Sequence, residues 1–547
     1  MSKFANLALS MDKIKQIFNK ELINVHGAAY LLALSSALSV LLALLRDRLL
    51  VSFVGPGYEL DIYYASFKIP DLLFAAIASF VSAFVLIPFL SYKNEKDSYK
   101  FLSEVTSSFV IVSVFFVFVL FVFAHFVLSA IFPDLYIADS EQFTFAFRVL
   151  LFQFLILGLS SAFSAFLQAK HKFVIYALAP IIYNLSIIMS LFLYPKYHIK
   201  ALVAGVLVGA VLHMLSFAVF LDLSQLRFKF ALKPFANLIK LAWPRTASLF
   251  VAQLSLLYIF HELSKIREGS VSAFQLASNL QAAPLSVIAA SYSVAAFPSL
   301  SKLYSRKEYK EFAKKLSLAV RHMLLWATAF AFLAIVLRAH IVRIVFGTEN
   351  FTWGHTIFVS AIFSVLVASL VFQSLNIIFA RALYAARIYI PAIVISLSNF
   401  ISLFLLSKFL IYKAESFRFL MDLFNLSSEF ELKVLLISIA FLLANFVAFL
   451  FSAYYLSSEF GDFCASDILK SSLQFLAAAF FAFLLTKYML YISSPFFPLD
   501  TFFNLLLQTI LGATLFAVVY IAILRIFSNL ELLETWRILK SQTIEKW

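Results

Sequence analysis

The chain has 547 residues, of which 63% are hydrophobic and only 13% charged, and its mean hydropathy is +0.95. A water-soluble domain of this composition would expose large apolar patches and precipitate, so the soluble protein classes are excluded. The net charge of +14 could point to a nucleic-acid partner. In a membrane chain, however, surplus Lys and Arg gather in cytoplasmic loops, so we expect membrane lipids and no nucleic acid as partners.

The N-terminal segment 1–26 places Lys13, Lys15 and Lys20 among apolar residues. This pattern predicts a short amphipathic helix, and the absence of a following cleavage site argues against a signal peptide. The single cysteine, Cys464, excludes an intramolecular disulfide. Because the sequence also has no Cys/His cluster, we expect no metal and no cofactor.

Apolar runs of about 20 residues or more recur along the chain and predict an all-α integral membrane protein with about fourteen transmembrane helices. Prolines inside the second and the eighth span predict that both are bent. The predicted spans are 28–54, 58–91, 103–132, 142–169, 173–194, 200–222, 236–261, 270–301, 313–338, 353–383, 388–412, 432–457, 469–493 and 502–527.

Two pairs of similar segments lie about 210 residues apart, at 84–93 and 294–302 and at 167–184 and 383–399. A repeat of this kind is typical of two-lobed transporters. It predicts two pseudo-repeated six-helix lobes followed by two C-terminal helices. The predicted domains are an amphipathic segment 1–26, an N-lobe 27–222, a cytoplasmic linker 223–235, a C-lobe 236–457, two final spans within 458–527 and a cytoplasmic tail 528–547.

The basic residues predict the orientation. If the N-terminus is cytoplasmic, the connections on that side hold roughly 26 Lys and Arg, against roughly 13 on the other side. Both termini are therefore expected in the cytoplasm.

Charged residues are concentrated in the first two spans: Arg46, Asp47, Arg48, Asp61, Lys68 and Asp71. A charge at the centre of a bilayer costs about 2.5–3.5 kcal/mol, so such groups need a partner or a polar cavity. One interpretation is that the arginines reach the headgroups and that Lys68 pairs with Asp71 one helical turn away. The other is that the group lines a polar cavity between the lobes, where Arg and Lys could hold a phosphate-bearing headgroup.

Weaker candidates for the cavity are Arg48, Asp71, Arg245, Gln253 and Asn279. The two amides are weak candidates because neutral amides in membrane helices often only bond to neighbouring helices. No Gly-rich nucleotide loop, zinc-protease motif or paired carboxylate suggests catalysis. The sequence thus favours a transporter over an enzyme. Its energy would come from the membrane potential, a monovalent cation or the concentration difference of the substrate.

Short motifs from residue 27 to 400 match one known family in combination. They are Leu-Arg-Asp at 45–47, Gly-Pro-Gly at 55–57, D-I-Y-Y-A-S-F-K-I-P-D-L-L at 61–73, A-F-V-L-I-P at 83–88, F-V-I-Y-A-L-A-P-I-I-Y-N at 173–184, P-R-T at 244–246 and F-P-S-L-S at 297–301. The chain resembles the MurJ (MviN) lipid II flippases of the MOP exporter superfamily, as a divergent member.

The resemblance implies a monomer that flips the peptidoglycan precursor lipid II, a lipid-linked anionic substrate, to the outer leaflet of the bacterial inner membrane by alternating access. It also implies cell-wall synthesis proteins as partners, and Arg46, Asp47, Asp61 and Lys68 as cavity residues. Three positions where the family usually has a cavity arginine hold Val40, Phe74 and Asn279. The alternatives are another MOP-type exporter, for a polysaccharide lipid or for drugs and cations, and a non-transporting membrane scaffold.

Overall fold

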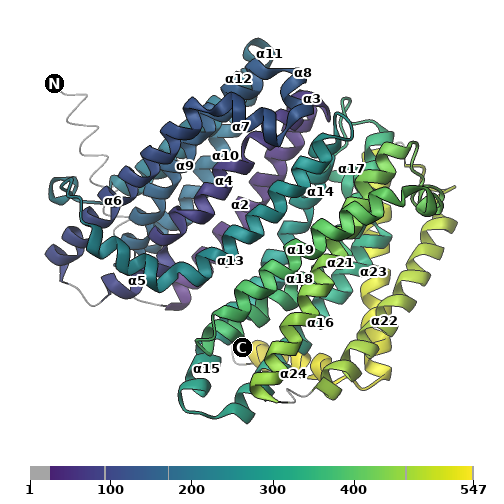
Figure 1. The fold of residues 1–547 in the computed structure, drawn as a ribbon. Helices are drawn as coiled ribbons and strands as arrows, with labels where there is room; N and C mark the ends of the chain where they lie inside the picture. The colour runs from purple at the N-terminus through teal and green to yellow at the C-terminus, as the bar shows by residue number, and fades with distance from the viewer. Residues whose placement is uncertain (1–24, 92–93, 171, 462–464, 500, 545–547) are drawn as a thin grey trace, which may run out of the picture. The chain divides into compact units, whose positions relative to one another are not determined.

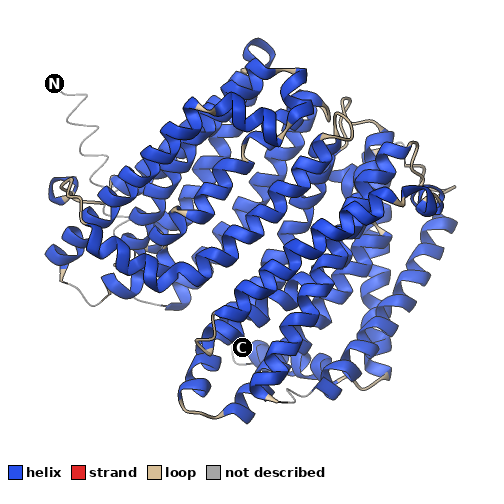
Figure 2. Cartoon of the chain, viewed as in Figure 1, coloured by secondary structure: helices blue, strands red, loops and turns tan. Residues whose placement is uncertain are grey.

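The computed structural model describes residues 25–91, 94–170, 172–461, 465–499 and 501–544. These residues form helices joined by short connections, with no strand among them (Figure 2). The predicted all-α class is therefore confirmed. The predicted amphipathic segment 1–26 lies almost wholly outside the described residues.

Every predicted span falls on helical segments, and most of them on one helix or a helix pair. Twelve helical stretches of the described residues are long and apolar enough to cross a membrane, or thirteen when one bent pair is counted as a span. The first predicted span corresponds to α2 (Val25–Phe53), which is not among these, so the expected fourteen is an approximate count. The helices that carry the twelve are α6 (Glu95–Val122), α9 (Ser140–Ala169), α10 (Phe173–Leu191), α12 (Ile199–Ala218), α13 (Leu232–Ser264), α14 (Ser270–Leu285) with α15 (Ser291–Ser305), α16 (Tyr309–Val336), α18 (Trp353–Ala385), α19 (Ile390–Tyr412), α21 (Glu429–Phe460), α22 (Ala465–Ser493) and α23 (Phe502–Ile526).

The second predicted span is broken into short helices, as its prolines predict. It consists of α3 (Tyr58–Ser66), α4 (Lys68–Ala76), one 3-10 turn and α5 (Ala83–Leu90), and it bends by 53°. In the eighth predicted span a π-helical turn at Ser286–Ala290 separates α14 from α15. Proline removes a backbone donor and crowds the preceding turn, which accounts for the break between α3 and α4 just before Pro70. Pro284 lies just before the π-helical turn. The 53° bend falls at Ile77, which has no proline within six residues.

The chain forms two compact units, residues 1–272 and 273–547. In the first unit α9 packs against α12, α5 and α6 (Figure 1). Close approach depends on small residues: a Cβ on Gly158 would lie 2.1 Å from the Phe109 ring, and one on Gly205 would lie 2.1 Å from Ser190 Oγ. Glycine therefore permits the tight helix contacts at both positions.

In the second unit α18 is the most buried of the membrane helices and packs against α16 and α21. The final pair α22 and α23 lies against α16, and α24 (Leu530–Ile544) occupies most of the predicted tail 528–547. By contacts, α13 groups with the first unit. The predicted lobes, 27–222 and 236–457, are defined by sequence repetition, and their limits stay predictions.

Candidate functional site

Arg46 lies in a fixed hydrogen-bonded position on α2. Its Nη2 is 2.8 Å and its Nε 3.0 Å from Asp47 Oδ1, and its Nη1 donates to Asn184 Oδ1 on α10 at 3.1 Å. The Asp47 side chain is 1% exposed, whereas that of Arg46 is 20% exposed. The buried carboxylate thus orients a guanidinium that still has an accessible edge.

Asn184 connects this guanidinium to the backbone of α10. Its Nδ2 donates to the carbonyl oxygen of Pro180 at 3.0 Å, while its Oδ1 accepts from Arg46. The proline lies inside α10, where it leaves the helix short of one backbone donor. Asn184 therefore ties α2 to α10 beside this position.

A cavity of about 320 Å³ lies next to this connection, inside the first unit. Helices α4, α9, α10 and α12 supply its walls, and α10 contributes Pro180 and Tyr183. Hydroxyl groups are its main polar feature, since Ser160 bonds His213 Nδ1 at 2.7 Å and Tyr183 Oη accepts from Gln153 at 3.2 Å. The lining residues are Phe74, Leu157, Ser160, Ser161, Ser164, Tyr176, Pro180, Tyr183, His213 and Phe217.

The serines of this cavity were not among the residues predicted from the sequence. Ser160, Ser161 and Ser164 follow one face of the C-terminal half of α9, whose other residues are mostly apolar. Small polar residues at this spacing also occur in ordinary helix–helix packing, so the pattern alone does not indicate a binding site. The partner of Ser160, His213, is 53 residues away in the chain and stands alone in the sequence.

The Asp61 carboxylate is held by two backbone N–H groups. Its side chain is wholly buried, Oδ2 accepts from the Gly269 backbone N–H and Oδ1 from that of Ser272, both at 2.7 Å. Gly269 has a φ of +84°, a conformation that favours glycine. The carboxylate therefore fastens α3 to the connection that follows α13 and to the first turn of α14.

Replacing Asp61 with alanine is expected to destabilise the protein, because two backbone donors would lose a charged acceptor. Hydrogen bonds to charged groups contribute about 1.5–3 kcal/mol each, so a loss of roughly 3 kcal/mol or more is expected. Thermal unfolding of the purified variant in detergent measures it. Asp134→Ala on α8 (Pro133–Ala138), at an exposed position of the first unit, is the control. Equal melting temperatures for the two variants would contradict this role.

Two further cations of the first unit lie over aromatic rings. Lys68 is 9% exposed, and its Nζ is 3.9 Å from the ring centroid of Phe260 on α13. The Arg245 guanidinium lies 4.0 Å from the ring centroid of Phe84. A ring face stabilises a cation in an apolar surrounding.

The remaining candidates are distributed over both units. Arg48, Asp71 and Gln253 are partly exposed positions of the first unit. Asn279 belongs to the second unit, where its Oδ1 accepts from Gln275 at 2.6 Å. The structure thus brings Arg46 and Asp47 together, and a single cavity shared by all the candidates stays a prediction.

Comparison with known proteins gives a consistent result. A family model described as "Lipid II flippase MurJ" matches residues 50–507. The "Probable lipid II flippase MurJ" of Buchnera aphidicola subsp. Acyrthosiphon pisum is 26% identical over 337 residues, which are 58% of this chain and 65% of that relative. The matched part of the chain therefore spans slightly less than two thirds of that relative.

Solved structures share the fold. A lipid II flippase MurJ in an inward closed conformation gives a TM-score of 0.70 at 22% identity, covering 91% of this chain and all of the other. An inward-facing multidrug resistance MATE family transporter of the MOP superfamily gives 0.60 at 12% identity, covering 77% of this chain and 95% of the other. These similarities confirm the predicted fold class.

Proposed function

The chain belongs to the lipid II flippase MurJ family, and from this premise we propose that it moves lipid II from the cytoplasmic to the outer leaflet by alternating access. The observation that carries the proposal is the guanidinium of Arg46, which Asp47 and Asn184 orient beside a cavity whose largely apolar lining includes serine and tyrosine hydroxyls. A planar guanidinium suits a diphosphate because it donates two parallel hydrogen bonds. Serine and tyrosine hydroxyls suit the sugar and peptide parts of the headgroup.

The energy source follows from the charge of the substrate. A membrane potential that is negative inside favours outward movement of an anionic headgroup, by about 2.3 kcal/mol per charge and 100 mV. We propose that this potential, or a monovalent cation gradient, drives the cycle without a cofactor.

The binding site of this chain is expected to depend strongly on few cations. Phe74 lines this cavity at a position where the resemblance leads us to expect an arginine. An aromatic ring cannot form a charge-assisted hydrogen bond with a phosphate. In our proposal Arg46 therefore supplies a larger share of the binding energy than any single cation in a site with more arginines.

We further propose that the protein works as a monomer in the bacterial inner membrane, close to cell-wall synthesis proteins.

Both termini would face the cytoplasm, because Lys and Arg concentrate in the connections on that side. Reporter fusions in the basic segment 306–315 should give cytoplasmic signals, and fusions in 133–141, which has no Lys or Arg, should give external ones. The reverse pattern would overturn the proposed orientation.

Complementation tests the proposed function. In a bacterium whose own lipid II flippase is depleted, expression of this chain is expected to restore growth, and an empty vector is not. Membrane levels are matched by quantitative immunoblotting. Failure to restore growth at a level at which a known flippase succeeds would instead favour another MOP-type exporter or a scaffold.

A further inference from the structure

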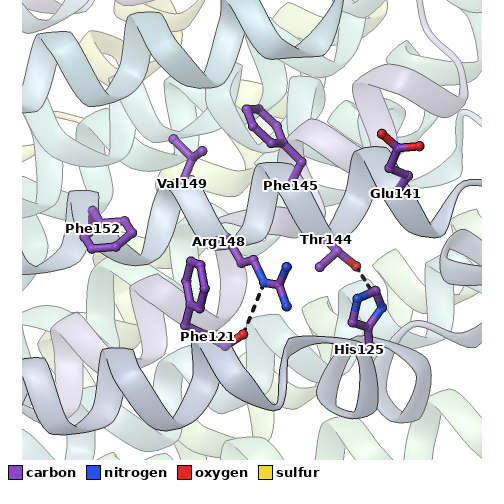
Figure 3. Close-up of a pocket in the computed structure, with 8 residues that line it drawn as sticks. All are labelled: Phe121, His125, Glu141, Thr144, Phe145, Arg148, Val149 and Phe152. Carbon is purple, nitrogen blue, oxygen red and sulfur yellow. Dashed lines mark hydrogen bonds between the residues drawn. The ribbon is translucent and has the colours of Figure 1, made fainter.

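A second cavity, of about 390 Å³, lies in the first unit, away from the Arg46 site. It is bordered by the end of α6, the start of α7 (Ala124–Ile131) and the first turns of α9 (Figure 3). Three of its lining residues, Phe121, Phe145 and Phe152, have side chains that are 37%, 39% and 45% exposed. Aromatic rings exposed on a membrane helix bundle face lipid or its headgroup region.

The cation of this cavity is Arg148 on α9. Its Nε donates to the carbonyl oxygen of Phe121 at 3.1 Å, and its guanidinium carbon lies 4.7 Å from the Phe121 ring centroid. Figure 3 shows the guanidinium in the cavity beside Thr144 and His125. Since the bond to Phe121 uses Nε alone, the two Nη groups remain suitable donors to an anion.

The lining residues follow an order along α9. Phe152 comes at one end, Arg148 and Thr144 in the middle, and Glu141 in the first turn of the helix. Glu141 is seven residues from Arg148, about 10 Å along the helix axis. Toward the N-terminal end of α9, the cavity lining therefore changes from apolar to cationic and then to anionic.

We propose that this cavity binds a phospholipid whose headgroup ends in a primary amine. Arg148 and Thr144 would hold the phosphate, Glu141 would accept from the amine, and the acyl chains would pass over the exposed phenylalanines. The carboxylate disfavours a purely anionic headgroup, and a quaternary amine has no N–H to donate to it. This site is separate from the proposed lipid II site, so the two proposals stand independently.

Native mass spectrometry of the delipidated protein tests the proposal, with phosphatidylethanolamine, phosphatidylcholine and phosphatidylglycerol of the same acyl chains. The wild type is expected to retain phosphatidylethanolamine several-fold better than the other two. Arg148→Gln should weaken binding of phosphatidylethanolamine by at least about tenfold. Glu141→Gln should remove the preference over phosphatidylcholine.

The matched control is Lys413→Gln. Lys413 lies 5.4 Å from the ring centroid of the exposed Tyr412, and neither residue lines either of the two cavities. This variant should bind all three lipids as the wild type does. If Arg148→Gln unfolds at a lower temperature than the wild type, its weaker lipid binding is set aside. The lipid preference of Glu141→Gln then tests the proposal. A preference that survives in Glu141→Gln, or equal retention of the three lipids by the wild type, would overturn the proposal.

Discussion

Replacing Arg46 with alanine is expected to abolish growth support in flippase-depleted cells while the protein stays in the membrane. The substitution removes the donor groups that Asp47 and Asn184 orient, and it leaves a carboxylate where the substrate's phosphates would bind. Loss of a charge-assisted pair of bonds costs about 3 kcal/mol or more, which corresponds to at least a hundredfold loss of affinity.

Arg46→Lys and Arg48→Ala separate this effect from a general loss of charge. Lysine keeps the charge but lacks the planar fork, so partial growth is expected. Arg48 is the next basic residue of α2, and its removal should have a smaller effect than Arg46→Ala. Membrane level and melting temperature are measured for each variant. Normal growth with Arg46→Ala at matched expression would show that the cationic site is not used.

Replacing Glu531 with alanine is expected to lower the free energy of unfolding by about 3–5 kcal/mol, because it leaves a largely buried arginine without its carboxylate. Glu531 lies on α24 and is 2% exposed, and its Oε1 is 2.7 Å from Nη1 of Arg321 on α16. Ser471 Oγ donates to the same carboxylate oxygen at 3.0 Å. These contacts hold the C-terminal helix against two membrane helices of the second unit.

Glu534→Ala is the matched control for this prediction. Glu534 lies one turn further along α24, is 48% exposed and faces His322 at 3.5 Å. A pair whose carboxylate is this exposed to solvent contributes about 1 kcal/mol or less. Thermal unfolding in detergent should therefore show a large drop for Glu531→Ala and a small one for Glu534→Ala. Similar drops would mean that the buried pair does not hold α24.

The helices could be predicted from the sequence because a long apolar run in a bilayer must satisfy its own backbone hydrogen bonds, which a helix does within one segment. A bend in the second span could also be predicted, since the span contains prolines. Its position could not, because the bend falls at Ile77, seven residues after Pro70. Arg46 and Asp47 could be predicted as candidate site residues because a charge is costly inside an apolar span.

The partners of these charges could not be predicted. Arg46 bonds to Asn184, which is 138 residues away, and Asp61 bonds to the backbone N–H of Gly269, 208 residues away. A backbone donor carries no residue-specific signal, so a carboxylate that binds one looks the same in the sequence as a carboxylate in a cavity. The role of Asp61 in fastening a connection therefore emerged only from the structure.

A chain that flips lipid II would expose lipid II on the outer face of the membrane. The most direct test adds a membrane-impermeant enzyme that cleaves lipid II to flippase-depleted cells, and measures the fraction of lipid II that is cleaved. Cells that express the wild-type chain should show extensive cleavage, whereas cells with Arg46→Ala or an empty vector should retain intact lipid II. If the wild-type chain is present in the membrane and lipid II stays as protected as with the empty vector, the chain is not a lipid II flippase.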